Sequence, residues 1–274
     1  IEFCPLNHHQ NYISGYFSLI FYFLFRRNIN IKYYTVYFKK MIKKYINYSQ
    51  ECKKQNIRLV EKKLSIQTFS NVSVRIDKKF FVIKPSGVPP KQININNCPI
   101  IRISNGKKVF GKYNPSTDTP THQILYKTFS HIKSISHTHS KYATAWAQTG
   151  KSIPMYGTTH ADYWAGNIPV TGFLKKSQLV EYEKNTGYLI VNLLKKLKFK
   201  STECPGVIVA GHGPFCWGNT FDSAVDYSEM LEYISEMAYF SDQIKVKNKL
   251  PSHISKKHFE RKFGKNRYYG QKWF

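Results

Sequence analysis

The sequence predicts a single α/β domain that extends from about Met41 to Phe274. Along it, short apolar runs bounded by turn residues alternate with longer segments of helical periodicity, as in domains that pack helices on a sheet. The chain has 274 residues, of which 42% are hydrophobic, and this is enough to bury a full core. No internal repeat and no long low-complexity tract divides the chain. We therefore expect one domain rather than two small ones.

The first 40 residues differ from the rest and are predicted to lie outside the functional protein. Residues 16–25 form an apolar run that is too short for a comfortable membrane span. A secretory signal carries its positive charge before such a run, whereas Arg26 and Arg27 follow it here. We expect the functional protein to begin near Met41, with residues 1–40 as an extension. A weak interfacial membrane anchor is the alternative.

The first elements of the domain are predicted to be a helix, a strand and a hairpin. The segment that Met41 opens, MIKKYINYSQECKKQNIRL, is a plausible first helix. Residues 80–88, FFVIKPSGV, are expected to be a strand that ends in a Pro-Ser-Gly turn. Residues 98–111 are expected to form a hairpin, because Asn105 and Gly106 are a strong turn signal.

Four helices are predicted in the remainder of the chain. In the first, Thr119 can serve as the N-cap and Pro120 suits the first helical position. In the second, Ser140 can cap a helix through KYATAWAQ that Gly150 ends. Residues 177–198 and 220–245 are expected to be longer helices, because their apolar residues recur at helical spacing.

The segment SHTHSKYATAWAQTG, residues 136–150, places two histidines one residue apart at the end of an apolar run. On a strand, Ile135, His137 and His139 share one face, and the two histidine Cα atoms lie about 7 Å apart. Two imidazoles at this spacing can converge on one divalent cation. A pair of hydrogen-bonded strand histidines explains the spacing equally well, so both interpretations stay open.

The best candidate for a third ligand is His212, in the segment VIVAGHGPFCWGN. Residues 207–210 are expected to be an apolar strand, and the glycines on both sides of His212 allow a tight turn. A catalytic zinc takes three protein ligands and keeps one position open. A third histidine at a strand end favours the metal interpretation without excluding the other.

Three polar turns could bind an anion. They are QTFSNVS (67–73), KPSG (84–87) and NPSTDT (114–119), and the last leads directly into a predicted helix N-terminus. Lys84 could supply a counter-charge for the anion. Asp118 could be a metal ligand, a residue that contacts the metal ligands without binding the metal, or a helix N-cap. Asp162 lies near His160 in a segment bounded by glycines, and the chain ends in a basic segment that contains Tyr269. Taken singly, each of these turns is better explained as a plain turn.

The formal charge of +26, from 42 Lys and Arg against 16 Asp and Glu, could indicate nucleic acid or an anionic membrane surface. The basic residues are instead spread along the chain beside many Ile, Asn, Tyr and Phe residues, as an AT-rich genome produces. We expect no nucleic-acid or membrane partner. The five cysteines are scattered and show no CxxC spacing, which favours a reducing compartment such as the cytoplasm.

Five segments together resemble the class II aldolase/epimerase family, and within it the L-ribulose-5-phosphate 4-epimerases. They are IKPSGV, NPSTDTPTH, HTHSKYATAWAQTGKSIPMYGTTHADYWAGNIPVT, GHGPFCWG and KHFERKFGKNRYYGQ. The resemblance runs in order from about Met41 to the C-terminus. PSTDTPTH, GTTHADYW and YYGQ favour the epimerases over the aldolases, which typically carry Glu where Asp118 stands.

The resemblance implies a three-layer α/β/α fold with a central mixed, largely antiparallel sheet, assembled as a homotetramer with sites between subunits. It implies one zinc per subunit and a sugar-phosphate substrate. The matching positions imply a zinc site made by His137, His139, His212 and Asp118. They imply that the substrate and its phosphate are bound by Ser70, Asn71, Lys84, Ser86, Gly87, Ser116, Thr117 and His258. They also imply that Asp162 and Tyr269 form the acid/base pair, which the adjacent subunit presents.

This sequence departs from the family at three positions. Ser70 stands where Gly is usual, Thr117 where a second Ser is usual, and Phe263 where a His is often found. The implied reaction is retro-aldol cleavage of C3–C4 in L-ribulose 5-phosphate and re-addition to give D-xylulose 5-phosphate. A class II sugar-phosphate aldolase, a basic nucleic-acid-binding protein and an inactive descendant are the alternatives. The last is disfavoured because the matched catalytic positions are intact.

Overall fold

The structure is a computed structural model that describes residues 31–246 and 248–270. The predictions made for residues 1–30 lie outside these described residues. The chain divides into two compact units, residues 1–46 and residues 47–274. Helix α2 (Ile31–Glu61) confirms the predicted first helix, but it begins ten residues before Met41. In the part of the chain that is described, no helix is both long and apolar enough to cross a membrane.

The core of the second unit is a sheet of seven strands in the order β4-β3-β2-β1-β5-β7-β6. Every pair of neighbouring strands is antiparallel, and parallel pairing in the described residues is confined to the isolated bridge between Val170 and Ile208. The predicted, largely antiparallel sheet is therefore confirmed. The strands are β1 (Asn71–Arg75), β2 (Phe80–Ile83), β3 (Ile100–Arg102), β4 (Lys108–Phe110), β5 (Ser134–His137), β6 (Gly206–Val209) and β7 (Gly213–Gly218).

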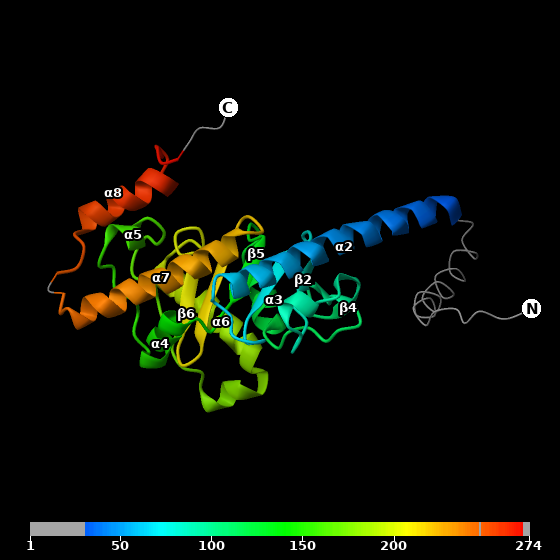
Figure 1. Ribbon diagram of the computed structural model, residues 1–274, viewed down its shortest axis with the longest axis horizontal. Helices are drawn as coiled ribbons and strands as arrows, with labels where there is room; N and C mark the ends of the chain where they lie inside the picture. Colours follow the sequence, from blue (N-terminus) through cyan, green and yellow to red (C-terminus); the bar gives the residue numbers. More distant parts are fainter. Residues whose placement is uncertain (1–30, 247, 271–274) are drawn as a thin grey trace, which may run out of the picture. The chain divides into compact units, whose positions relative to one another are not determined.

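Helices cover both faces of this sheet, which gives three layers (Figure 1). On one face, Ser136 of β5 donates a hydrogen bond to the carbonyl of Ala224 in α7. On the other face, Ser73 of β1 contacts the ring of His122 in α3. The helices after α2 are α3 (Thr119–Thr128), α4 (Lys141–Thr149), α5 (Thr158–Ala161), α6 (Tyr182–Leu197), α7 (Ser223–Gln243) and α8 (Ser252–Phe263).

The start of α3 corrects one prediction. Its N-cap is Asp118, and Thr119, which was expected to cap the helix, is its first residue. The Thr119 hydroxyl donates to the carbonyl of Ser116. The Asp118 carboxylate makes no capping bond, because it accepts a hydrogen bond from Asn71 at 2.7 Å instead. At the start of α3, the Asp118 side chain therefore points toward Asn71 of β1 and not toward the N–H groups of its own helix.

Helix α4 confirms the prediction for residues 140–150, with Ser140 at the N-cap and Gly150 at a φ of 65° after its last residue. The Ser140 side chain does not cap it. The carboxylate of Glu232 in α7 accepts hydrogen bonds from the backbone N–H groups of Tyr142 and Ala143 at 2.8 and 2.9 Å. A distant acidic residue thus satisfies the free N–H groups of this helix.

The other predicted elements are present with adjusted ends. The expected hairpin is β3 and β4, with Gly106 at a φ of 73° in its turn. The expected helix 177–198 is a 3-10 segment, Lys176–Glu181, followed by α6. Two further 3-10 turns, Pro90–Gln92 and Ile95–Asn97, lie between β2 and β3.

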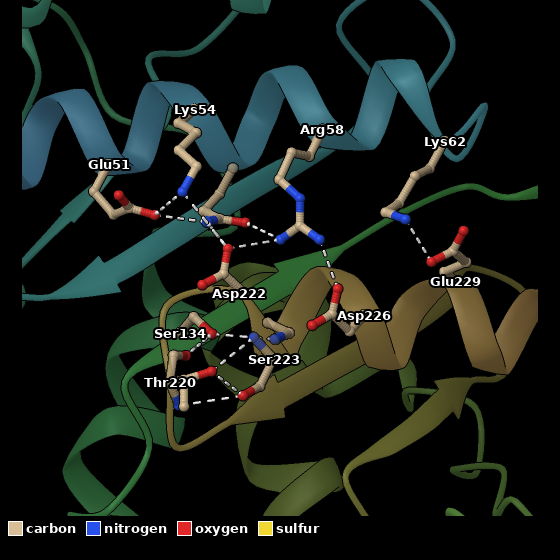
Figure 2. A network of polar contacts seen from close by, with 12 residues as sticks. Glu51, Lys54, Arg58, Lys62, Ser134, Thr220, Asp222, Ser223, Asp226 and Glu229 are labelled. Carbon is tan, nitrogen blue, oxygen red and sulfur yellow. Dashed lines mark hydrogen bonds and ion pairs between the residues drawn. The ribbon is translucent and has the colours of Figure 1, made fainter. Parts of the chain in front are cut away.

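A row of ion pairs joins the C-terminal end of α2, at residues 58–62, to the N-terminal part of α7 and its N-cap (Figure 2). The two terminal nitrogens of Arg58 reach Asp222 and Asp226 at 3.0 and 2.6 Å. One turn further on, Lys62 reaches Glu229 at 2.6 Å. Because the partners lie more than 160 residues apart in the chain, this row fixes a long-range packing of two helices.

The end of α3 is held by a buried cation, Arg75 of β1. Its guanidinium donates to the carbonyls of Ile132, Tyr126 and Phe129 at 2.6, 2.7 and 3.0 Å. It also lies 4.6 Å from the centre of the Tyr126 ring. Carbonyls near a helix C-terminus carry partial negative charge, so they can replace a carboxylate as the partner of this arginine.

Candidate metal centre and active site

Three histidines meet at one end of the sheet. His137 is the last residue of β5, His139 follows two residues later, and His212 lies in the turn between β6 and β7. One nitrogen from each ring belongs to a group in which all atoms lie within 4.8 Å of one another. Gly211 has a φ of 69°, which a residue with a side chain adopts only rarely. This turn is what brings His212 back toward β5.

The hydrogen bonding of His137 orients its ring for metal binding. Its Nδ1 lies 2.9 Å from the carbonyl oxygen of Pro214, so Nδ1 carries the proton and Nε2 keeps a free lone pair. The Nε2 atoms of His137 and His139 are 3.0 Å apart. Two nitrogens bound to one tetrahedral zinc lie about 3.3 Å apart. The spacing of these two nitrogens, and the all-nitrogen donor set of the three rings, therefore fit a zinc ion.

Burial keeps these three rings in the neutral form that a metal requires. It lowers the pKa of His137 well below its usual value, and the neighbouring His212 and His139 lower it further. Burial also lowers the pKa of His139 and of His212, and the charge of Asp118 opposes the shift in both. The alternative of a simple strand pair accounts for two of these histidines but not for the third.

Asp118 and Asn71 lie beside the histidines. Asn71 of β1 is the cross-strand partner of His137, and its amide donates to the Asp118 carboxylate. Asp118 is not a member of the three-histidine group, although its charge acts on His139 and His212. The amide oxygen of Asn71 is buried and has no hydrogen-bond partner. A buried acceptor of this kind is costly unless a ligand or water satisfies it.

The two loops that carry the predicted phosphate-binding residues lie side by side. Pro85 and Pro115 form an antiparallel bridge, and the backbone N–H of Ser86 donates to Asn114 at 3.0 Å. The backbone N–H of Ser116 donates to the carbonyl of Lys84, also at 3.0 Å. Ser86, Gly87 and Thr117 are exposed, so an anion can reach them. Gly87 has a φ of 66° and no atom near the position of a Cβ.

The ammonium group of Lys84 is buried next to these loops. Its nearest hydrogen-bond partners are the carbonyl oxygens of Thr68 and Pro85, at 3.4 and 3.3 Å. Burial lowers the pKa of Lys84, while the thiol of Cys52 and the carboxylate of Asp118 act in the opposite direction. Two long contacts satisfy a buried cation poorly, which leaves it available to an anionic ligand. Ser70, also buried, donates to the hydroxyl of Ser65.

Asp162 and Tyr269 belong to a second group, between α5 and α8. The guanidinium of Arg261 donates to both carboxylate oxygens of Asp162, at 3.0 and 2.6 Å, and His258 lies 3.1 Å from one of them. The Tyr269 ring lies 5.2 Å from the same guanidinium. Burial raises the pKa of Asp162, but the hydrogen bonds from Arg261 and His258 outweigh it and lower this pKa.

The predicted site residues therefore form two sets in one chain. Within the described ranges, no hydrogen bond, ion pair or ring contact joins the Asp162 group to the three histidines. Sequence reasoning missed Arg261, although His258 and Arg261 are three residues apart and so share one side of a helix. It also missed two neighbours of the histidines, His122 and Tyr182, because no spacing or motif in their local sequence links them to the histidine positions.

Comparison with known proteins gives consistent results. Residues 50–239 match the family model of the class II aldolase and adducin N-terminal domain. The chain is 42% identical over 209 residues to L-ribulose-5-phosphate 4-epimerase UlaF of Salmonella paratyphi B, a match that covers 75% of this chain and 90% of that protein.

Two solved structures share the fold. An L-fuculose 1-phosphate aldolase superposes with a TM-score of 0.67 at 24% identity and covers 78% of this chain and 95% of its own. The L-fuculose 1-phosphate aldolase from Glaciozyma antarctica PI12 superposes with a TM-score of 0.63 at 16% identity, and the match covers 79% of this chain and 82% of that chain. The fold is therefore that of the class II aldolases.

Proposed function

Because this chain belongs to the class II aldolase and adducin N-terminal domain family, we propose that it is an L-ribulose-5-phosphate 4-epimerase. The observation that carries the proposal is the cluster of His137, His139 and His212 in a chain 42% identical to a relative of that name. The reaction interconverts L-ribulose 5-phosphate and D-xylulose 5-phosphate.

The hydrogen on C4 of the substrate is not acidic, because the ketone at C2 does not activate it. Cleavage of the C3–C4 bond avoids this obstacle. The C4 hydroxyl gives up its proton, the C3–C4 electron pair passes to the ketone, and the products are a dihydroxyacetone enediolate and glycolaldehyde phosphate. The aldehyde rotates, the bond forms again on its other face, and the new C4 oxygen takes up a proton.

His137, His139 and His212 would hold one zinc ion per subunit, and such an ion supplies a Lewis acid for negative charge on oxygen. As neutral ligands the three imidazoles leave the charge of the ion undiminished. Asp118, held by Asn71, provides a fixed carboxylate beside them. The buried amide oxygen of Asn71 can accept a hydrogen bond from a substrate hydroxyl.

The phosphate would bind between the loops that carry Ser86, Gly87, Ser116 and Thr117, with Lys84 supplying positive charge. Ser70 would lie beside the substrate. Tight binding of the phosphate would keep the glycolaldehyde phosphate in the site while its aldehyde group rotates. The C3–C4 bond can then form again, whereas release of the fragment would give net cleavage.

Asp162 and Tyr269 would move the C4 hydroxyl proton on opposite faces of the aldehyde, with His258 nearby. Their separation from the three histidines within one chain supports a site completed by a second subunit, as in a homotetramer. We propose the cytoplasm as the compartment, with the sugar phosphate as the partner in place of nucleic acid or a membrane.

The test uses the purified full chain, loaded with zinc and supplied with L-ribulose 5-phosphate. We expect D-xylulose 5-phosphate to form, and we expect an EDTA-stripped sample to be inactive until zinc is restored. Release of free dihydroxyacetone and glycolaldehyde phosphate would instead identify a class II aldolase. A folded, zinc-loaded chain that leaves the substrate unchanged would overturn the proposal.

A further inference from the structure

The rings of His137 and His212 are held in different ways. His137 donates from Nδ1 to a backbone carbonyl, at 2.9 Å. Among residues 31–246 and 248–270, no carbonyl accepts from the His212 ring. Its Nδ1 instead faces the hydroxyl of Tyr182 at 3.5 Å, and the two ring centres are 6.0 Å apart. Since His212 lies in a turn between two glycines, the backbone alone restrains its ring weakly. The rings of His137, His139 and Phe215 also pack against it, but among the described residues Tyr182 is the side chain that the structure places at its Nδ1.

The position of Tyr182 is fixed by the packing of α6 against α3. Tyr182 is the first residue of α6, and its carbonyl accepts a hydrogen bond from the Thr186 hydroxyl. The next carbonyl, that of Glu183, accepts from Thr121 of α3. At Gly187 the two helices approach so closely that an added Cβ would lie 2.9 Å from the Cβ of Ile124. The contacts between α6 and α3 therefore hold the helix start that carries the Tyr182 phenol.

A ligand histidine in a metal site usually donates its second ring N–H to an acceptor, which fixes the tautomer and the ring orientation. We propose that Tyr182 is a positioning residue that accepts the Nδ1 proton of His212 and so directs the Nε2 lone pair at the shared metal position. This inference rests on the three histidines being metal ligands, as in the proposed function. Loss of such a partner typically weakens metal binding about 10–100-fold.

The test compares Tyr182→Phe with Tyr188→Phe in the full chain. Tyr188 lies on the same helix and is 43% exposed, so it serves as the matched control. Zinc affinity is measured by competition with a chromophoric chelator, and cobalt(II) absorption reports the ligand geometry. We expect Tyr182→Phe to bind about 10–100-fold more weakly, with an altered cobalt spectrum, and Tyr188→Phe to match the wild type.

A second readout needs no metal. Long-range proton–nitrogen correlation spectra of the metal-free protein, with ¹⁵N-labelled histidine, report which ring nitrogen carries the proton. We expect His212 to be protonated at Nδ1 in the wild type and in Tyr188→Phe, and to become a mixture of tautomers in Tyr182→Phe. Equal melting temperatures of the two variants would show that the difference does not arise from unfolding.

The outcomes separate this inference from the proposed function. If Tyr182→Phe binds zinc as tightly as the wild type and keeps the Nδ1–H tautomer, Tyr182 does not position His212, and the epimerase proposal is unaffected. If the wild type binds zinc no better than His139→Ala does, the three-histidine metal centre itself is wrong, and the inference is overturned with it.

Discussion

The imidazole of His137 lies flat against the ring of Phe215, with the two ring centres 4.2 Å apart and the planes inclined by 16°. The residues are cross-strand partners in β5 and β7, so the antiparallel register itself produces the stacking. Together with the hydrogen bond to Pro214, this contact sets the direction of the His137 ring.

We expect Phe215→Ala to destabilise the metal-free protein by about 3–5 kcal/mol, because Phe215 is fully buried and its removal leaves a cavity. The free energy of unfolding is measured with urea. Phe173→Ala is the control, since Phe173 is 66% exposed and its removal should change stability by about 0.5 kcal/mol or less. Similar losses in the two variants would contradict the packing described for Phe215.

We expect His139→Ala to lose zinc and epimerase activity together, because two imidazoles and a water hold zinc far less tightly than three. Zinc content is measured by elemental analysis after dialysis against a weak chelator. The exposed His253 provides the control, His253→Ala, which should retain about one zinc per chain. Full zinc content in His139→Ala would remove His139 from the ligand set.

We expect Tyr269→Phe to keep its zinc and to lose epimerase activity by about 10²–10⁴-fold, the usual contribution of a positioned acid or base. The neighbouring Tyr268, at 62% exposure against 59% for Tyr269, offers a closely matched control. Turnover and zinc content are measured for both variants. A fully active Tyr269→Phe would refute the acid/base assignment.

We expect the stability of the protein to fall as the pH drops below about 6.5, in part because of His122. Burial lowers the pKa of His122 to about 3. Between this pKa and that of the unfolded chain, the unfolded chain binds a proton on His122 and the folded chain does not. Above the pKa of His122 in the unfolded chain, His122 is neutral in both states and costs the folded state nothing. As the pH falls from that value toward the pKa in the folded chain, the free energy of unfolding decreases progressively. The slope from one such group is at most about 1.4 kcal/mol per pH unit.

The measurement is urea unfolding at several pH values between 7 and 4, in the wild type and in His122→Gln. The variant should show a flatter dependence of the free energy of unfolding on pH than the wild type. Parallel curves for His122→Gln and the wild type would mean that His122 takes up its proton in the folded state as readily as in the unfolded one.

We expect Arg58→Ala to cost about 1–2 kcal/mol, because Arg58 has ion-pair partners in both Asp222 and Asp226 and is only 21% exposed. Lys54→Ala is the control, as the Lys54 side chain is 58% exposed and its contact with Asp222 is longer, at 3.7 Å. The difference between the variants should shrink in 1 M salt, which screens surface charges. A salt-independent difference would point to lost packing instead.

Local patterns in the sequence predicted much of the fold and the core of the site. The i, i+2 spacing of His137 and His139, with glycines around His212, favoured three convergent imidazoles without excluding a hydrogen-bonded strand pair. The resemblance to the class II aldolase/epimerase family implied the full set. The α/β class and the hairpin at residues 98–111 followed from short-range periodicity and turn residues in the same way. These features depend on neighbours in the chain, which is why they could be predicted.

What could not be predicted depends on pairs that are far apart in the chain. Glu232 caps a helix by accepting from Tyr142, 90 residues earlier in the chain, and Arg261 binds an aspartate 99 residues away. The N-cap of α3 was misplaced by one residue for the same reason, since the Asp118 side chain turns toward Asn71 on another element. Such contacts are set by strand register and helix packing, on which local periodicity carries no information.

The bridge between Pro85 and Pro115 has a thermodynamic consequence for ligand binding. It joins the two loops of the proposed phosphate site through backbone hydrogen bonds within the chain itself. The conformational entropy of both loops is therefore lost when the chain folds, and little remains to be lost on association. If a phosphorylated ligand binds at this proposed site, we expect its association rate to be limited by encounter rather than by loop rearrangement.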